Sequence, residues 1–335
     1  MNLTEKLQLA YERLKAAERV LIVSHAAPDA DALASMGAMR EIAQSLHLAV
    51  YGYADKKAAT AYNFIPFEEL VLSEAPGDLR DFGVIVILDC GSLSRTGLEA
   101  RLRTLMKAAQ EGRIIKRPYI IEFDHHEPQE TYADLEIRLT EKASTTEIIY
   151  HFLKANNLEI NKTLATCILI GLLTDTGHFL HANSSRESMA VAAEMLLRGA
   201  ALSNILKHTI HNKSFLSLKI WGRVLENLHF NPDTGLASSG LTTAELKELA
   251  GPVGGEADAD LFGDLASFLS SLSGVRVALL LREEGDRVKG SLRTNDNQVD
   301  VAKIAQNWDG GGHQKAAGFS VAGRLVRTGT GWKVV

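Results

Sequence analysis

Histidines and aspartates in this sequence gather where apolar segments end. Asp124-His125-His126 follows residues 119–123, an apolar run apart from Glu122, and Pro128 then stops the regular structure. Because neighbouring side chains of an extended chain point to opposite sides, the two histidines are expected to have different roles unless the chain turns between them. Alone, this triplet is compatible with a metal or catalytic site and equally with a chance cluster at the surface.

A second group comprises His25, Asp29 and Asp31, which follow the apolar residues 20–23. The next segment, 32–46, is rich in Ala, Leu and Met and predicts a helix, so both aspartates would lie at a helix start. An aspartate at that position can cap the helix and interacts favourably with its dipole. Two aspartates and a histidine in one strand-to-helix turn exceed what a cap requires, and they indicate a ligand-binding site.

Two more aspartates follow apolar elements. Asp89 comes directly after residues 84–88, the most apolar short run in the chain, although Asp-Cys-Gly at this position is also compatible with a simple turn. Asp175 follows an apolar helix predicted over residues 164–173. Arg95 is close enough to Asp89 in the sequence to face the same site. These groups extend the pattern of carboxylates at the ends of buried elements.

The spacing of apolar residues predicts the elements that must position these groups. Strands are predicted from short apolar runs at 20–23, 47–53, 84–88, 119–123 and 135–139. They alternate with predicted helices, which is typical of an α/β fold with a mainly parallel sheet flanked by helices. Ligands of such sheets bind outside the carboxyl ends of the strands, so the groups above would share one edge. Ser-Thr-Thr-Glu at 144–147 predicts a capping box and is interpreted as structural.

The length of 335 residues suggests two domains. We predict a metal-binding domain over residues 1–199, a connection over 200–212, and a smaller α/β domain with a mixed sheet over 213–335. In the second domain, Gly310-Gly311-Gly312-His313 is followed closely by Lys315. Three glycines let backbone N–H groups approach an anion, and the histidine and lysine add charge. A flexible loop would have the same composition.

Composition excludes several classes of protein. The net charge of −5 argues against a protein that coats long nucleic acid, and no apolar stretch approaches the roughly 20 residues that span a bilayer. Two cysteines and the lack of a secretory leader predict a cytoplasmic location. Residues 274–335 hold ten Lys and Arg against six Asp and Glu. This asymmetry suggests an acidic metal-binding half and a basic phosphate-binding half, or a normal fluctuation of surface charge.

Five motifs occur in one order and together resemble the DHH phosphoesterase superfamily with its glycine-rich DHH-associated C-terminal domain. They are His25-x-x-x-Asp29-x-Asp31, Asp89, Asp124-His125-His126, Asp175 in Thr-Asp-Thr-Gly, and Gly310-Gly311-Gly312-His313. The resemblance extends from about residue 20 to residue 319. The compact length looks like the nanoRNase/pAp-phosphatase branch, because RecJ-type exonucleases are usually longer and family II inorganic pyrophosphatases have a different C-terminal domain. Ala30 departs from the glycine that many members have between the two aspartates.

The resemblance implies a site for two Mn²⁺ ions, with Mg²⁺ or Co²⁺ as alternatives. By resemblance, one ion is held by His25, Asp29 and Asp89, and the other by Asp31, Asp89, His125 and Asp175. Carboxylates and imidazoles without thiolates independently suit Mn²⁺ or a similar borderline ion. His126 is expected to bind the scissile phosphate and protonate the leaving oxygen, and Asp124 to orient a histidine.

Two divalent ions and four aspartates have no net charge, so the phosphate charge must be met by other groups. The candidates are Arg293, Gly310, Gly311, Gly312, His313 and Lys315. The guanidinium fork of Arg293 suits a second phosphate. The implied activity is hydrolysis of short RNA to mononucleotides and of 3′-phosphoadenosine 5′-phosphate (pAp) to AMP. Short RNA oligonucleotides and pAp-like nucleotides are therefore the expected partners, and neither a membrane nor an obligate protein partner is expected.

Three other functions remain open at this level. Two are enzymatic: a cyclic or linear dinucleotide phosphodiesterase acting on c-di-AMP or pApA, and a RecJ-like single-strand 5′ exonuclease. The third is a nucleotide-binding regulatory protein without catalysis, which is disfavoured because every expected ligand residue is present. A cleft between two domains would favour short or end-bound substrates over a continuous duplex.

Overall fold

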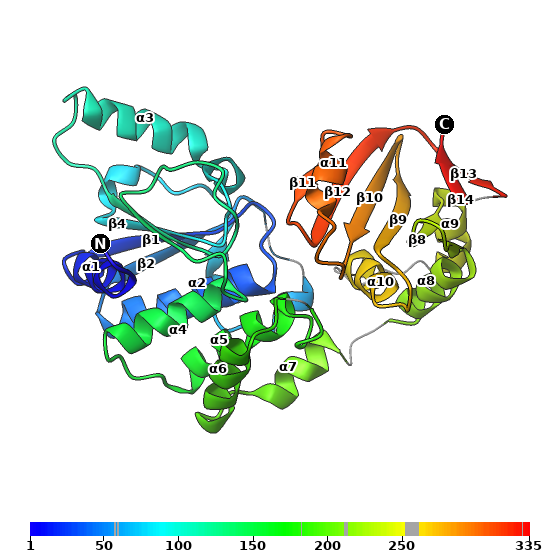
Figure 1. Cartoon of the computed structure of the whole chain (residues 1–335). Coiled ribbons are helices and arrows are strands. Elements are labelled where there is room, and N and C mark those ends of the chain that lie inside the picture. The colour runs from blue at the N-terminus through cyan, green and yellow to red at the C-terminus, as the bar shows by residue number, and fades with distance from the viewer. Residues whose placement is uncertain (57, 59, 182, 211–213, 252–260, 330) are drawn as a thin grey trace. The chain divides into compact units, whose positions relative to one another are not determined.

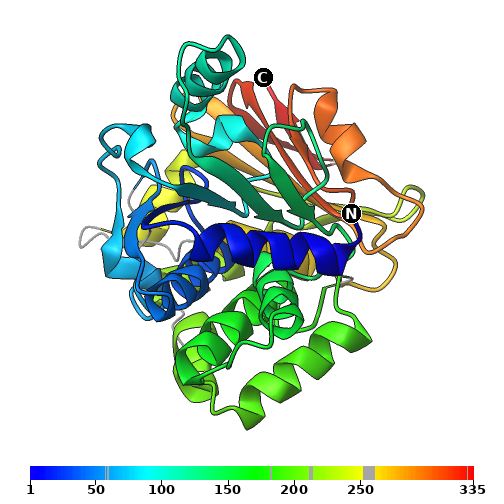
Figure 2. The same cartoon turned by 90° about the vertical axis from the view of Figure 1, so that its left-hand side faces the viewer.

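A sheet of six parallel strands organises the first of two units, Met1–His211. The computed structural model of the chain describes residues 1–56, 58, 60–181, 183–210, 214–251, 261–329 and 331–335. In space the strands follow the order β3-β2-β1-β4-β5-β6. Figure 1 labels the neighbours β4, β1 and β2, and Figure 2 shows the molecule turned by 90°. Their bounds are β1 Arg19–Val23, β2 Ala49–Tyr53, β3 Val71–Leu72, β4 Val84–Leu88, β5 Tyr119–Asp124 and β6 Leu135–Arg138. The predicted fold class is confirmed.

The sequence of β4 explains why this sheet is buried on both faces. All five of its residues are buried. Val84, Val86 and Leu88 pack in the larger hydrophobic core, whereas Ile85 and Ile87 pack in a second core. Successive side chains of a strand point to opposite faces, so a continuous apolar run is what a sheet covered on both sides requires.

Helices cover the two faces of this sheet unequally. Their bounds are α1 Leu3–Lys15, α2 Ala30–Ser45, α3 Glu99–Gln110, α4 Thr145–Ala155, α5 Lys162–Asp175, α6 Arg186–Leu197 and α7 Leu202–Thr209. Six of them contribute buried residues to the larger core, and α3 contributes Leu102 to the smaller one, so it lies on the other face (Figure 1). Over the described ranges, no helix has both the length and the apolar character needed to cross a bilayer.

The strand order contains one reversal, between β1 and β4. After β1 the chain builds β2 and β3 on one side, and it then returns to place β4 on the other side of β1. Side chains that follow β1 and β4 therefore flank the crevice where the direction of winding changes. Open α/β sheets bind their ligands in such a crevice. His25 follows β1 and Asp89 follows β4, so the fold directs both to this place.

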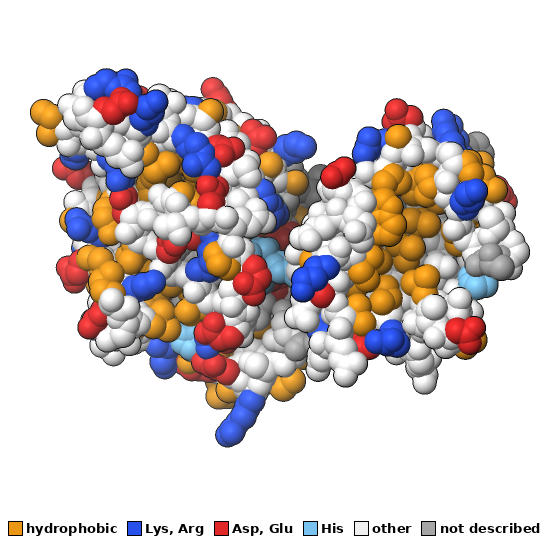
Figure 3. Space-filling view, turned by 45° about the horizontal axis from the view of Figure 1, so that its top comes forward, with side chains coloured by type: hydrophobic (Ala, Val, Ile, Leu, Met, Phe, Trp, Pro, Cys, Tyr) orange, Lys and Arg blue, Asp and Glu red, His pale blue; other side chains and the backbone are white. Residues whose placement is uncertain are grey.

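The second unit, Asn212–Val335, contains a mixed sheet of six strands, as predicted. Its strands are β7 His229–Asn231, β8 Leu236–Leu241, β9 Val277–Glu284, β10 Arg287–Arg293, β11 Gly311–Gly312 and β12 Ala316–Ala322, in the order β11-β12-β10-β9-β8-β7. Among the described strands of this sheet, only β8 and β9 pair in parallel. The helices are α8 Phe215–Glu226, α9 Thr243–Ala250, α10 Leu261–Ser270 and α11 Val301–Gln306, and a hairpin joins β13 Leu325–Thr328 to β14 Gly331–Val334. Figure 3 shows hydrophobic side chains gathered on one face of this unit.

Two segments differ from their predicted structure. The connection expected over residues 200–212 contains α7, because Ile205 supplies an apolar side chain that is fully buried in the larger core. Residues 211 and 212 of that connection, and residue 213, the first of the predicted second domain, lie outside the described residues. The expected glycine loop is partly a strand, since Gly311 and Gly312 pair with Gly318 and Ala317. Gly312 has φ +143°, and a Cβ there would lie 2.5 Å from the carbonyl oxygen of Ala316, so this position requires glycine.

Candidate metal centre

Histidine and aspartate side chains meet at the carboxyl ends of β1, β4 and β5. The structure brings three groups of potential ligand atoms together: His25, Asp29 and Asp89; Asp31, His125 and Asp175; and Asp89, His125 and His126. Within each group the ligand atoms lie within 4.8 Å of one another. Because Asp89 and His125 each belong to two groups, the three form one continuous cluster.

Each side chain reaches this cluster from a defined position in the fold. His25 lies two residues after β1, Asp29 is the N-cap of α2, and Asp31 lies in the first turn of that helix. Asp175 is the last residue of α5. Ala30, where many members of the resembled family have glycine, is the first residue of α2 and does not have a positive φ. The methyl group at this position is therefore compatible with the local backbone.

His125 lies at the centre of the cluster. Its Nε2 atom is 3.4 Å from Asp89 Oδ1 and 3.2 Å from Asp175 Oδ2. Although burial lowers the pKa of His125, the hydrogen bond with Asp89 and the charges of Asp175, Asp89 and Asp31 outweigh it and hold that pKa well above its usual value. The imidazole is therefore held as a cation among several carboxylates whenever no other cation is present.

The carboxylates of the cluster carry more negative charge than His125 offsets. Burial, followed by the charge of Asp89, raises the pKa of Asp31 to about 7. Burial, followed by the charge of Asp31, raises the pKa of Asp175 well above its usual value. Like charges held close together and away from water favour either protonation or a bound cation. The oxygen and nitrogen donors present here fit a divalent cation of the Mn²⁺ type.

Asp89 adopts a backbone conformation that is uncommon for a residue with a side chain. Its φ is +58°, and its N–H donates to the carbonyl oxygen of Phe123 at 3.1 Å. Left-handed conformations cost free energy for most residues, although Asp and Asn tolerate them best. The strained turn directs the Asp89 carboxylate toward both His25 and His125. Cys90 and Gly91 continue the turn, which was one of the two interpretations of Asp-Cys-Gly from the sequence.

The start of α4 contributes to the cluster, which its sequence pattern did not reveal. The N–H groups of Thr145 and Thr146 donate to the two oxygens of Asp31 at 2.7 and 3.2 Å. The Thr145 hydroxyl donates to Asp89 Oδ1 at 2.9 Å. Exposed N–H groups at a helix start are suited to anions, and here they bind a buried carboxylate. A Thr-Thr pair after the cap residue was the only local signal of this role.

The predicted capping box at this helix is formed only in half. The Ser144 hydroxyl accepts a hydrogen bond from the N–H of Glu147 at 3.1 Å, as predicted. The Glu147 carboxylate, however, accepts from the N–H of Ala143 at 2.8 Å and not from that of Ser144. The interpretation of this segment as purely structural was incomplete, because its second and third residues bind the candidate metal ligands.

Gly171 allows α5 to approach this part of the cluster. A Cβ atom at this position would lie 2.0 Å from Asp31 Oδ1 and 2.2 Å from the Thr146 hydroxyl oxygen. Any side chain here would therefore displace a candidate ligand or its hydrogen-bond donor. Gly171 is a functional candidate that sequence reasoning missed. It lies inside an apolar helix, where no neighbouring polar residue or turn signal indicates a role for it.

His126 is held by Asp124, the last residue of β5. Asp124 Oδ1 is 2.8 Å from His126 Nδ1 and also accepts the N–H of His126 at 2.8 Å, while Oδ2 accepts the N–H of Gly91 at 2.6 Å. Burial would raise the pKa of Asp124, but its contacts with His126 and Gly91 hold that pKa well below its usual value. The histidine that Asp124 orients is therefore His126, which leaves His125 to face Asp89 and Asp175.

A buried arginine ties together the two loops that carry these residues. Arg138, at the end of β6, lies 2.6 Å from Glu122 Oε1 through Nη2. Its Nη1 donates to the carbonyl oxygens of Gly91 at 3.3 Å and His126 at 3.2 Å. Tyr132 donates its hydroxyl to the same carboxylate, and Glu122 is completely buried. The sequence signal was a single glutamate inside the apolar strand β5, and its partner could not be identified from the sequence.

Arg95 adds an exposed cation beside the cluster. A Cβ atom at Gly91 would lie 3.4 Å from Arg95 Nη1 and 3.6 Å from the Cβ of His126, so these two side chains flank Gly91. The carbonyl oxygen of Arg95 accepts the N–H of Ala26 at 2.7 Å, which joins the loops after β4 and β1. Arg95 therefore faces the same site as Asp89, as its distance in the sequence suggested.

The candidate phosphate-binding residues of the second unit lie close to one another within that unit. Arg293 ends β10 and pairs with Ala316 of β12, directly after Lys315. Burial lowers the pKa of Arg293, and among the described residues no ion pair neutralises it. His313 forms a tight turn with Ala316 through two backbone hydrogen bonds of 2.7 and 3.1 Å. Lys315 donates through Nζ to the carbonyl oxygen of Asp296.

A fourth group of potential ligands has a different character. It comprises Glu147, His151 and Glu187. The Lys142 ammonium lies 2.6 Å from Glu187 Oε2 and 3.9 Å from Glu147 Oε1. Because a cation from the chain already lies among these carboxylates, the group is an ion-pair network and not part of the candidate metal centre.

Comparison with known proteins gives matches over nearly the whole chain. The model of the DHH family, N-terminal domain, matches residues 19–172, and the model of the DHHA1 domain matches residues 243–327. The chain is 31% identical to the bifunctional oligoribonuclease and PAP phosphatase NrnA of Thermus thermophilus, over 95% of this chain and 89% of that protein. It is 22% identical to the Bacillus subtilis protein of the same name, over 91% and 90%. An exopolyphosphatase-related protein from Bacteroides fragilis shares the fold, with a TM-score of 0.82 at 23% identity over 94% of this chain and 90% of that one.

Proposed function

The chain belongs to the DHH family of phosphoesterases, and we propose that it degrades short oligoribonucleotides to mononucleotides and dephosphorylates pAp to AMP. Two relatives named as bifunctional oligoribonucleases and PAP phosphatases match at least 91% of the chain and support this proposal. The observation that carries it is the convergence of three groups of ligand atoms on Asp89 and His125. Such a cluster suits hydrolysis of a phosphate ester assisted by metal ions.

Two divalent ions, preferably Mn²⁺, fit the residues of the cluster. His25, Asp29 and Asp89 would hold one ion, and the other would be held by Asp31, Asp89, His125 and Asp175. When bound, two such ions supply an activated water and offset the negative charge that develops on phosphorus oxygens. Thr145 and Thr146 support the arrangement, because their hydrogen bonds fix the orientation of the Asp31 and Asp89 carboxylates.

His126 is proposed to bind the scissile phosphate and to donate a proton to the leaving oxygen. Asp124 contacts Nδ1, so Nε2 is the ring atom that would contact the substrate. The Asp124 carboxylate at Nδ1 fixes the orientation of the ring, so that Nε2 is directed toward the leaving oxygen. Arg95, on the other side of Gly91, adds positive charge for the same phosphate.

Phosphate-binding groups in the second unit support a preference for small substrates with a further phosphate. Arg293 has a half-buried guanidinium without a carboxylate partner among the described residues. Its Nη1 donates to the carbonyl oxygen of Leu292 at 3.0 Å, and the other N–H groups are available to a phosphate. Gly310, Gly311 and Gly312, together with His313 and Lys315, would supply backbone and side-chain donors. Lys315 uses one donor on Asp296 and retains two others.

A substrate panel tests the proposed activity. The purified chain with Mn²⁺ is offered pAp, a diribonucleotide, a long single strand and cyclic di-AMP side by side, and products are separated by chromatography. Release of mononucleotides from the diribonucleotide and of AMP from pAp is expected, with little attack on the long strand. Cleavage of the long strand as fast as the diribonucleotide would favour a RecJ-like exonuclease. Preferred cleavage of cyclic di-AMP would favour a cyclic-dinucleotide phosphodiesterase.

A further inference from the structure

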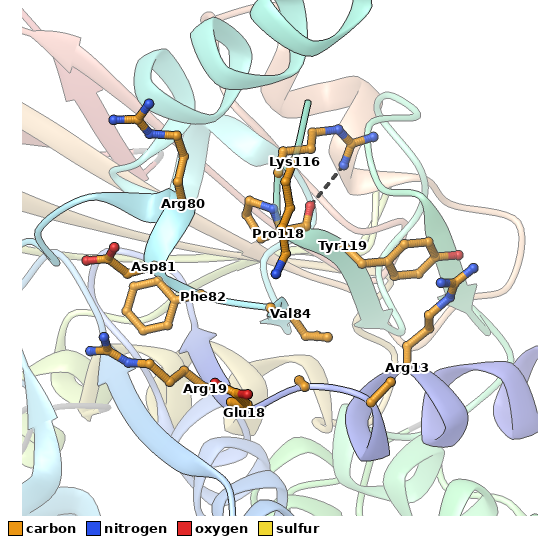
Figure 4. A pocket seen from close by; sticks show the side chains of 14 residues that line it. Arg13, Glu18, Arg19, Arg80, Asp81, Phe82, Val84, Lys116, Pro118 and Tyr119 are labelled. Atoms are coloured by element: carbon orange, nitrogen blue, oxygen red, sulfur yellow. Dashed lines mark hydrogen bonds between the residues drawn. The ribbon is translucent and has the colours of Figure 1, made fainter. Parts of the chain in front are cut away.

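A pocket of about 440 Å³ lies at the opposite edge of the first unit's sheet (Figure 4). Its lining includes Arg19, the first residue of β1, and Gly83 and Pro118, which precede β4 and β5. His25 follows the other end of β1, six residues of nearly extended chain away, or about 20 Å. The pocket is therefore separate from the candidate metal centre.

Five cationic side chains line this pocket: Arg13, Arg19, Arg80, Lys116 and Arg117. Arg80 is paired with Asp78, and Arg117 lies 2.5 Å from each oxygen of Asp134. Among the described residues, no ion pair joins Arg13, Arg19 or Lys116 to a carboxylate. Two acidic residues, Glu18 and Asp81, also line the pocket, so three unpaired cations face two carboxylates there.

Two of the unpaired cations are held by aromatic rings. The guanidinium of Arg13 lies 4.4 Å from the centre of the Tyr119 ring, and that of Arg19 lies 5.5 Å from the centre of the Phe82 ring. A guanidinium stacked on a ring keeps its N–H edge available and loses less freedom when it binds. Figure 4 shows these pairs at two sides of the pocket, with the Lys116 side chain extended toward its middle.

The helix that reaches this pocket ends there, so it offers carbonyl groups and not the N–H groups of a helix start. The terminal carbonyl groups of α1 carry partial negative charge. Ala16 and Ala17, directly after α1, line the pocket. The cationic side chains would therefore supply most of the attraction for an anion, so removing two of them should weaken its binding.

We propose that this pocket binds a small molecule with two or more phosphate groups, of the nucleoside diphosphate class. A volume of about 440 Å³ is in the range of small-molecule sites. A diphosphate offers several oxygens to two guanidinium forks and an ammonium, which matches the three unpaired cations better than a monophosphate does. This site is independent of the proposed hydrolytic activity.

Isothermal titration calorimetry tests this assignment by measuring the dissociation constants of ADP, inorganic pyrophosphate and AMP for the Mn²⁺-loaded full chain. In the double variant Arg19→Ala/Lys116→Ala, we expect ADP binding at the pocket to weaken at least about tenfold. A control variant, Lys107→Ala/Arg186→Ala, removes one lysine and one arginine from exposed positions outside the pocket and should bind ADP as the parent does. Hydrolysis of the diribonucleotide should be the same in both variants.

The experiment is repeated in an Asp89→Asn background, which weakens binding at the candidate metal centre and isolates the pocket. Equal binding of ADP and pyrophosphate would identify the phosphates as the only recognised part, and tighter binding of ADP would add the nucleoside. The assignment is overturned if the Arg19→Ala/Lys116→Ala change leaves ADP and pyrophosphate binding unaltered, or if the control variant loses as much. Binding of a longer RNA strand is measured for the same variants. If the Arg19→Ala/Lys116→Ala change weakens RNA binding but not ADP binding, the assignment is overturned in favour of a macromolecular ligand.

Discussion

The two edges of the first unit's sheet carry opposite chemistry. At the carboxyl edge, Asp31 and Asp89 are almost fully buried, and Asp175 is about three-quarters buried. At the amino edge, Arg19 and Lys116 are exposed to water. Both edges are built from the same strands β1, β4 and β5. The difference therefore arises from the residues that flank each strand at its two ends and from how deeply those residues are packed.

The comparison shows that a group of like charges favours a bound counter-ion mainly when it is buried. Exposed cations at the amino edge are hydrated and cost little without a partner, whereas carboxylates withheld from water are costly until a cation neutralises them. Helix direction accentuates the contrast. Asp31 receives N–H groups from the start of α4, but Asp175 lies at the end of α5, where negative charge is disfavoured. A cation at the carboxyl edge is thus needed most beside Asp175.

Removing one charge from the carboxyl edge should produce the largest effect. Asp89→Asn retains a residue that tolerates positive φ but removes the carboxylate shared by two ligand groups. We expect hydrolysis to fall at least about a thousandfold, because several kcal/mol of charge stabilisation would be lost. Initial rates, bound Mn²⁺ by elemental analysis, and circular dichroism are measured. The exposed Asp233→Asn variant is the control, and a fully active Asp89→Asn protein would refute the role of Asp89.

Removing Arg138, which connects the loops at the carboxyl edge, should have the next largest effect. Arg138→Met leaves Glu122 buried without its cation, which should destabilise the fold by roughly 3–5 kcal/mol. The loops holding Gly91 and His126 also lose a shared donor, so kcat should fall about 10–100-fold with a smaller change in KM. Urea denaturation and steady-state kinetics measure the two effects.

A double variant separates stability from positioning at this site. Glu122→Gln/Arg138→Met removes both charges and should regain part of the lost stability, because no uncompensated charge remains buried. The kcat should stay low, since the hydrogen bonds to Gly91 and His126 are still missing. Recovery of kcat together with stability would show that Arg138 has only a structural role.

Filling the space at Gly171 should have a moderate effect on the carboxyl edge. In Gly171→Ala the new methyl would overlap Asp31 and Thr146, so we expect a loss of about 1–3 kcal/mol and weaker Mn²⁺ binding. Gly222→Ala in α8 meets no atom within 4 Å and should instead stabilise its helix by about 1 kcal/mol. Thermal unfolding with and without Mn²⁺ compares the two. A Gly171→Ala protein with unchanged Mn²⁺ affinity would contradict the close packing of α5 on Asp31.

The smallest effect is expected at the amino edge. Burial would raise the pKa of Asp134, but its contact with Arg117 and the N–H of Ile120 lower that pKa below the usual value. The contribution of Asp134 to stability is therefore present above about pH 4 and is lost as the pH falls through its folded pKa. Asp134→Asn should cost about 1 kcal/mol or less at pH 7, with a difference from the parent that shrinks in acid. Urea denaturation at several pH values measures this, and a constant difference would be inconsistent with it.

The sequence alone determined the chemistry at the ends of single elements. Asp89 and Asp124-His125-His126 directly follow apolar runs, so their place at a sheet edge could be predicted from local periodicity. The mixed sheet of the second unit could be predicted in the same way. Local sequence was less informative where an element was short, as with α7 in the predicted connection and the two-residue strand β11.

Contacts between distant segments were decided only by the tertiary structure. The N–H of Thr145 and the carboxylate of Asp31 are 114 residues apart, and Arg138 and Gly91 are 47 apart. Such pairs form because the strand order β1-β4-β5-β6 and the packing of α2 against α5 bring their segments together. The amino-edge pocket likewise combines residues from before β1, β4 and β5, each unremarkable in its own segment. The local spacing of apolar residues determines whether a segment forms a helix or a strand. Hydrogen bonds and burial between elements depend instead on which strands and helices are neighbours in space.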